Sequence, residues 1–141
     1  KRVLCWEYGV PTPIKYIAEP DMHTIAAVTS HPNGNYFAGQ SLDNKIVLFD
    51  TRNKFSMVKK RSFKGHVIAG YACQIGFSSN GKFIMSGDGR GQIWFWDFNS
   101  GKILRKLQSH KNSPCIGAVW HPVEASTVAT CSWNGQICLW K

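Results

Sequence analysis

Four short apolar segments of the chain each end in an aromatic residue, and these aromatics recur at intervals of 43, 47 and 44 residues: Trp6, Phe49, Trp96 and Trp140. A second series keeps the same period, because His23, His66 and His110 follow one another at intervals of 43 and 44 residues. Two markers in phase are not expected by chance, and a fixed period of this length predicts an array of structural repeats. The 141-residue chain is therefore best understood as a series of similar units.

Each repeat contains the same four segments of β-strand character. The first strand follows the histidine, and we expect it at 25–29, 71–77 and 115–120. The second strand is expected at 36–39, 83–86 and 128–131. The third strand ends in the aromatic residue and an acidic residue, or a remnant of this pair, at 3–7, 46–50, 93–97 and 137–141. A fourth strand precedes the next histidine, as at 102–107. Asn33-Gly34 and Asn80-Gly81 separate the first two strands of two repeats, and Asn-Gly is typical of a hairpin turn.

These strands are apolar at odd and even positions alike, as in Ile93-Trp94-Phe95-Trp96. A sheet with one face in water should instead alternate apolar and polar residues. Sheets stacked on both sides bury both faces, and four-stranded antiparallel sheets stacked in this way are the blades of a β-propeller. The period, together with Gly65-His66 and Trp96-Asp97, resembles the WD40 repeat.

The resemblance to WD40 proteins implies an all-β fold, a partial propeller arc of about three four-stranded antiparallel blades. Within it we expect residues 1–7 to be the last strand of a preceding blade. WD40 repeats are expected at 13–52, 53–99 and 100–141, the last without its outer strand. The chain begins inside a strand pattern without a methionine, so further blades are expected upstream, and seven is the usual number in the family.

WD40 blades share a hydrogen-bonded tetrad of His, Ser/Thr, Asp and Trp, and the resemblance places its positions here. They are His23, Gly39, Asp43 and Phe49 in the first repeat, His66, Ser86, Arg90 and Trp96 in the second, and His110, Thr130, Asn134 and Trp140 in the third. No repeat is complete: Arg90 has no acceptor for His66, although Asp88 is a candidate substitute, whereas Asn134 keeps an acceptor. We therefore expect apolar burial to stabilise the blades more than the polar network does.

The sequence contains no pattern typical of an active site, so we expect no enzyme, cofactor, metal ion or small-molecule substrate. The five cysteines lie in apolar runs without a CxxC pair, which is typical of reduced, buried thiols in a cytosolic or nuclear protein. Gly87–Gly91 lacks the Lys-Ser/Thr of a phosphate-binding loop and is expected to be a turn between strands. No apolar run has the length of a membrane span.

Positive charge is the feature that points to partners, since the formal net charge is +9. Basic residues are concentrated in two predicted outer strands and form a basic rim: Lys54, Lys59, Lys60, Arg61, Lys64, Lys102, Arg105 and Lys106. Such a rim suits RNA phosphates or an acidic protein segment. The alternative is that these lysines discourage strand addition at an exposed edge. Tyr71, Trp120 and Trp133 are either contact aromatics or core residues.

The last two repeats carry a narrower resemblance. Phe63-Lys64-Gly65-His66, Ala69–Gln74 and Ser86–Gly89, followed by Cys115–Pro122 and Thr130–Gly135, are similar to the C-terminal blades of the pre-mRNA-processing factor seventeen family, also called cell-division-cycle protein forty. The resemblance implies a nuclear scaffold of the spliceosome, acting around the second catalytic step of pre-mRNA splicing. It also implies spliceosomal proteins as partners, with spliceosomal RNA as a candidate partner for the basic surface.

A different class of function remains open from the residues alone. Phe49-Asp50-Thr51-Arg52 is similar to the WDxR signature of substrate receptors of cullin-type ubiquitin ligases, with Phe in place of Trp. An unrelated WD40 scaffold in signalling or trafficking is the third possibility.

Overall fold

The computed structural model describes residues 1–52 and 54–141 of the chain, which form β-strands joined by turns and loops. The strands are β1 (Val3–Trp6), β2 (Pro13–Ile17), β3 (Ile25–Ser30), β4 (Tyr36–Ser41), β5 (Lys45–Asp50), β6 (Ser56–Lys64), β7 (Ile75–Phe77), β8 (Phe83–Gly87), β9 (Gln92–Asp97), β10 (Ile103–Gln108), β11 (Cys115–Trp120), β12 (Val128–Ser132) and β13 (Ile137–Trp140). In this described part of the chain, no helix has the length and apolar character needed to cross a membrane.

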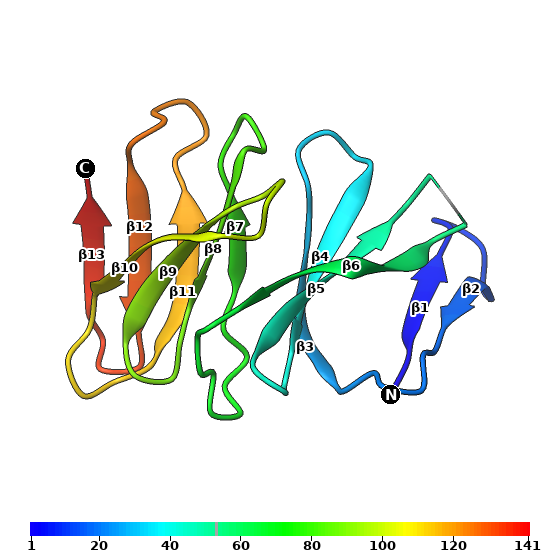
Figure 1. Ribbon diagram of the computed structural model, residues 1–141, viewed down its shortest axis with the longest axis horizontal. Helices are drawn as coiled ribbons and strands as arrows, with labels where there is room; N and C mark the ends of the chain where they lie inside the picture. The colour runs from blue at the N-terminus through cyan, green and yellow to red at the C-terminus, as the bar shows by residue number, and fades with distance from the viewer. Residues whose placement is uncertain (53) are drawn as a thin grey trace.

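The strands pair into four antiparallel sheets that follow one another across the molecule (Figure 1). The first sheet contains β1 and β2. The first blade contains β3 to β6, the second β7 to β10, and the third β11 to β13. The inner strand β7 lies between β3 and β11, so the three blades follow one another in an arc. The expected all-β architecture of four-stranded antiparallel sheets is present.

The sheets are offset by one strand from the predicted repeats. β2 pairs with β1, so the segment 1–7 is not the last strand of its sheet, and the expected repeat 13–52 begins with a strand of the sheet before it. In the same way β6 completes the first blade and β10 completes the second. The first residue of the predicted repeat 53–99 lies outside the described residues.

Both faces of the central strands are buried, as their apolar pattern predicts. In β5, Ile46 and Leu48 pack into the core between the first and second blades. Their neighbours Val47 and Phe49 pack on the opposite side, with Ile17 of β2. β9 follows the same rule, since Trp94 and Trp96 face the first blade whereas Ile93 packs with Ala118 and Val128 of the third. The alternation therefore separates two cores rather than a core and a wet surface.

The two end sheets carry large apolar side chains that are exposed. Leu4, Trp6, Ile14 and Tyr16 are exposed on the sheet of β1 and β2. Val119, Ile137 and Leu139 are exposed on the third blade. These faces are apolar, as the buried faces of β5 and β9 are.

Two local expectations are refined by backbone geometry. In both Asn-Gly turns only the glycine has a positive φ, +72° for Gly34 and +70° for Gly81. The asparagine side chains instead accept backbone N–H groups two residues on, as Asn33 does from Asn35 and Asn80 from Lys82. The strand expected at 71–77 is reduced to Ile75–Phe77, and residues 71–74 lie in the loop that follows the turn at Ala69 and Gly70, where φ is +51° and +84°.

We predict that Gly91→Ala is much more destabilising than Gly135→Ala. Both glycines have positive φ, +77° and +84°, so either substitution should lower the free energy of unfolding by about 1–2 kcal/mol. A Cβ at Gly91 would also lie 1.9 Å from the carbonyl oxygen of His110, whereas nothing lies within 4 Å of one at Gly135. We expect a total loss of about 3 kcal/mol or more at Gly91, measured by urea unfolding. Equal losses for the two variants would contradict this packing.

Candidate interaction surfaces

The third blade joins three of its tetrad positions. His110 Nε2 lies 3.1 Å from Thr130 Oγ1, and the Trp140 indole donates to the same oxygen at 3.0 Å. Asn134 is not part of this group, because its side-chain oxygen accepts the backbone N–H of Gln136. The acceptor predicted at Asn134 is therefore used within the turn.

In the second blade, the tetrad residues His66 and Ser86 are hydrogen-bonded to a glutamine of the first blade. His66 Nε2 donates to Gln40 Oε1 at 2.8 Å, and Gln40 Nε2 donates to Ser86 Oγ at 2.6 Å and to the Cys73 carbonyl at 3.2 Å. Gln40 belongs to β4 of the first blade, and its side chain is fully buried. This glutamine joins two consecutive blades, and it was not among the residues expected from the tetrad spacing.

The remaining second-blade positions have other partners. Asp88, the candidate substitute, accepts the Trp94 indole N–H at 2.8 Å and the backbone N–H groups of Arg90 and Gln92. The Trp96 indole donates to the Lys64 carbonyl at 3.0 Å. Arg90 is exposed. Asp88 thus organises its own turn rather than orienting His66.

In the first blade the tetrad positions are only loosely connected. His23 is half exposed, and its ring lies 3.8 Å from Asp43, which also binds Lys45 at 2.8 Å. Gly39 leaves no room for a hydroxyl side chain, since a Cβ there would lie 2.9 Å from Ile25. Phe49 has no donor and stacks on Phe37 with ring centroids 4.6 Å apart. Apolar packing replaces the polar network here.

Burial shifts the pKa of three buried groups toward their neutral forms. Burial lowers the pKa of His66 to about 4, against the opposing charge of Asp88. Burial likewise raises the pKa of the Cys73 thiol to about 12 and that of Cys115 to about 11. All five cysteines are free, with Cys73 and Cys115 buried and the other three half-buried. In the described residues, no group of three or more His, Cys, Asp or Glu is placed to hold a metal ion.

The residues of the basic rim do not lie in one common groove. Lys60, Arg61 and Lys64 line a groove of about 720 Å³ between β6 and the turn at 99–101 of the second blade. Lys59 instead pairs with Glu19 at 2.8 Å, and that hydrogen bond raises the pKa of Lys59. The other four residues of the rim lie outside the lining of this groove: Lys54, Lys102, Arg105 and Lys106.

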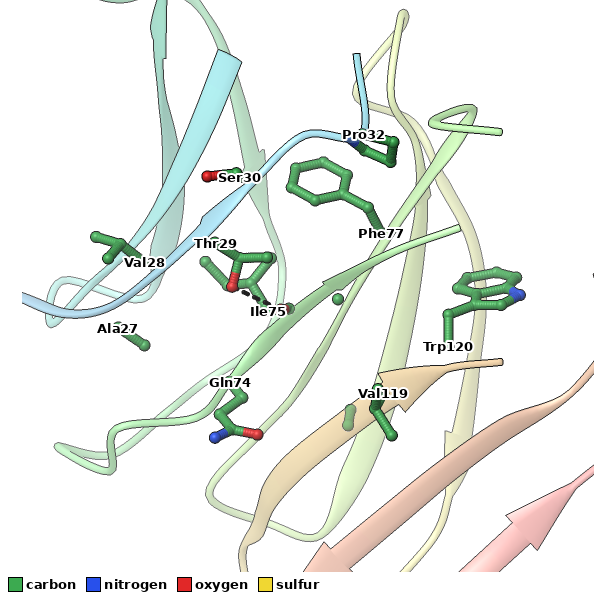
Figure 2. A pocket seen from close by; sticks show the side chains of 12 residues that line it. Ala27, Val28, Thr29, Ser30, Pro32, Gln74, Ile75, Phe77, Val119 and Trp120 are labelled. Carbon is green, nitrogen blue, oxygen red and sulfur yellow. Dashed lines mark hydrogen bonds between the residues drawn. The ribbon is translucent and has the colours of Figure 1, made fainter. Parts of the chain in front are cut away.

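The inner strands form a second surface, a depression of about 530 Å³ (Figure 2). Its residues come from β3, β7 and β11 and from Pro32 and Gln74 next to two of these strands, and none of them is titratable. Thr29 of β3 donates to the Ile75 carbonyl of β7 at 2.9 Å, which links the first and second blades across it. The depression offers apolar and hydrogen-bonding contacts but no acid or base.

Of the three aromatic residues that the sequence left as either core or contact residues, one lies beside a core and two lie at the surface. Trp120 packs against Phe83 and Phe95 beside the core between the second and third blades. Tyr71 and Trp133 come from different blades and form an edge-to-face pair with centroids 4.9 Å apart. Because Trp133 is 67% exposed, this pair is a surface feature.

The repeats of this chain also occur in known proteins. The family model described as "WD domain, G-beta repeat" matches residues 15–50, 57–97 and 101–141. Pre-mRNA-processing factor 17 of Homo sapiens is 49% identical over 140 residues, which are 99% of this chain and 24% of that protein. The protein of the same name from Saccharomyces cerevisiae is 36% identical over 137 residues, 97% of this chain and 30% of that protein. The chain thus spans about a quarter to a third of these relatives.

A solved structure supports the fold. The β-propeller domain of Cps50 (Swd1) from Myceliophteria thermophila matches with a TM-score of 0.70 and 21% identity, over 86% of this chain and 36% of that one. At this identity the likeness shows the fold alone. The expectation of a WD40-type propeller arc is confirmed by the repeats and by this neighbour.

We predict that Gln40→Leu lowers the free energy of unfolding by about 1–3 kcal/mol, because it leaves the buried His66 Nε2 and the Cys73 carbonyl without this partner. Gln136→Leu, at an exposed turn position, is the matched control and should change stability by less than about 0.5 kcal/mol. Urea unfolding measures both. If the Gln40 variant were as stable as the control, Gln40 would not be a residue that holds the two blades together.

We also predict that His66 makes the protein less stable in acid. Its pKa is about 4 when folded and about 6.5 when unfolded, so the unfolded state takes up a proton first as pH falls. The contribution of neutral His66 to the free energy of unfolding is complete above about pH 6.5. It falls by about 3 kcal/mol in total as the pH is lowered from about 6.5 to about 4. His66→Gln should flatten the dependence of the urea midpoint on pH in this window. An unchanged slope would show that His66 is not buried as a neutral ring.

Proposed function

The chain belongs to the WD40-repeat family, and on that premise we propose that it is part of a non-catalytic scaffold of the spliceosome. In this proposal it docks protein and RNA components around the second catalytic step of pre-mRNA splicing, in the nucleus. The observation that carries the proposal is the 49% identity to human pre-mRNA-processing factor 17 across 99% of the chain. The yeast relative of the same name supports it at 36% identity.

The distribution of reactive groups supports a scaffold without chemistry of its own. His66 and His110 are buried and bound to Gln40 and Thr130. The most buried thiols have pKa values raised to about 12 and 11, which keeps them protonated and poor nucleophiles. The tetrad positions then serve to hold the blades, whereas partners bind at the exposed surfaces.

Charge supports an anionic partner. The net charge is +9, and Lys60, Arg61 and Lys64 line one groove between adjacent blades. A groove with three cations can follow a phosphate backbone, which is the reason to include spliceosomal RNA among the partners of the basic rim. The apolar depression of the inner strands suits protein segments instead.

The ubiquitin-ligase alternative gains no support. The Arg52 guanidinium binds both carboxylate oxygens of Asp50, at 3.2 and 2.9 Å, and the Tyr36 hydroxyl at 2.6 Å. It is therefore used within the first blade, and the names of the relatives favour splicing.

The test is a purification and depletion experiment with the full-length protein. A tagged copy should co-purify from nuclear extract with spliceosomal RNAs and proteins. Depletion should leave the first catalytic step intact and block the second, so cleaved 5′ exon and lariat–3′ exon intermediates accumulate while spliced product falls. Restoring the protein should reverse the block. A protein found only outside the nucleus, or splicing unaffected by its removal, would overturn the proposal.

A further inference from the structure

Four loops of the second and third blades meet at one end of the arc, at the lower edge of Figure 1. We call this surface the loop face, and it consists of residues 65–74, 88–91, 109–114 and 133–136. Each of these segments starts or ends at the same end of the paired strands, because Ile75 pairs with Ser86, Gln92 with Gln108, and Cys115 with Ser132.

Hydrogen bonds between the loops hold the loop face in one shape. Gly89 N–H donates to the Val67 carbonyl at 2.9 Å, and the backbone N–H groups of Ser109 and His110 both donate to the Gly91 carbonyl at 2.9 Å. Ser132 Oγ lies 2.6 Å from Ser113 Oγ, which links the third blade to the loop before it. A surface ordered in this way loses little conformational entropy when it binds.

An aromatic pair from two blades lies on this surface. Tyr71 and Trp133 meet edge to face at 86°, with centroids 4.9 Å apart. Neither residue is part of the three buried cores. A rigid tryptophan that is two-thirds exposed keeps a ring face available to a flat partner.

Two cations share a pocket with Tyr71 of the pair. A pocket of about 590 Å³ is lined by Tyr71, Arg90, Gln108, Lys111 and Asn112, together with neighbouring backbone. Arg90 and Lys111 are exposed. The loop face contains one acidic residue in its sequence, Asp88, which is 1% exposed and binds the Trp94 indole. The exposed charges of the loop face are therefore both positive, Arg90 and Lys111.

We propose that the loop face binds single-stranded RNA, with a base stacked on the Tyr71–Trp133 pair and the adjoining phosphates against Arg90 and Lys111. Stacking platforms next to cations are the physical basis of single-strand binding, because every base has a flat face and every nucleotide a phosphate. A duplex hides its base faces and cannot use the pair. A peptide of Asp and Glu would pair with the cations but has no flat ring to stack on the aromatic pair. The choice of RNA over DNA rests on the proposed function.

This site is separate from the basic rim. The rim follows the outer strands β6 and β10, whereas Arg90 and Lys111 lie in the loops beyond the ends of β8 and β10. The rim has no exposed aromatic pair in its groove. Stacking is therefore the property that distinguishes the loop face experimentally.

The test measures binding of the full-length protein to a fluorescent single-stranded oligouridine of about twelve nucleotides. Trp133→Ala should weaken binding about tenfold, and Tyr71→Ala should do the same while Tyr71→Phe does not. Tyr8→Ala removes an aromatic residue that is fully exposed in the turn between β1 and β2, outside the loop face, and is the matched control, with no expected change. Since Trp133 is mostly exposed, its loss should not unfold the protein, which the thermal midpoint verifies.

The charged residues give an independent readout. Arg90→Gln should reduce the slope of log affinity against log salt by about 0.7, the value of one phosphate contact on a single strand. Lys82→Gln, at the opposite end of β8, is the control. Photocrosslinking with 4-thiouridine should label the peptide that contains Tyr71 or Trp133.

Two outcomes would overturn the proposal. One is an unchanged affinity for oligouridine in Trp133→Ala. The other is a loop face that binds an oligoglutamate peptide through Arg90 and Lys111 but does not crosslink to 4-thiouridine. Failure of the splicing role is visible separately, because it is measured by co-purification and depletion with the unaltered protein.

Discussion

Successive side chains of β5 enter two different cores, and the same is true of β9. Each central sheet is a single layer of backbone with apolar packing on both sides, so its position is determined by its two neighbours. The other features depend on this arrangement. The loops meet at one end because the strands that carry them are stacked, and Trp96 can reach the Lys64 carbonyl of the preceding blade only because β6 and β9 are in contact across that core. The polar groups refine a geometry that the apolar faces establish.

Much of the fold was predictable because a propeller blade has a strong periodic signal. The aromatic and histidine series indicated the strands, and their ends mostly agree to within a residue or two. Periodicity does not show which strand pairs with which, however. It was therefore unable to reveal that β2 belongs with β1 and β6 with β5, since that information lies in hydrogen bonds between neighbours. The strand at 71–77 was overestimated because Tyr71-Ala72-Cys73 looks like the start of an apolar strand, although these residues lie in the loop that follows the turn at Ala69 and Gly70.

The candidate site was less accessible to the sequence. Clustered basic residues predicted a basic surface on the outer strands, but only Lys60, Arg61 and Lys64 share a groove. Lys59 is paired with Glu19, a contact between segments far apart in the chain. Tetrad spacing directed attention to Gly39, whereas the next residue, Gln40, points toward the following blade and holds His66. Tyr71 and Trp133 are likewise neighbours only after two blades have stacked.

Gln40 also has a consequence for how such an array can change over time. In an ideal repeat protein every unit has the same contacts, so units can be duplicated, deleted or exchanged. Here the Gln40 side chain of one unit holds the histidine that precedes the next unit and the serine within it. The other two repeats of this chain have Gly87 and Cys131 at the corresponding place. The two blades form a matched pair, and neither would fit equally well beside another partner. The first and second blades are therefore not interchangeable with other blades, and a substitution at Gln40 changes the contacts of the blade next to it.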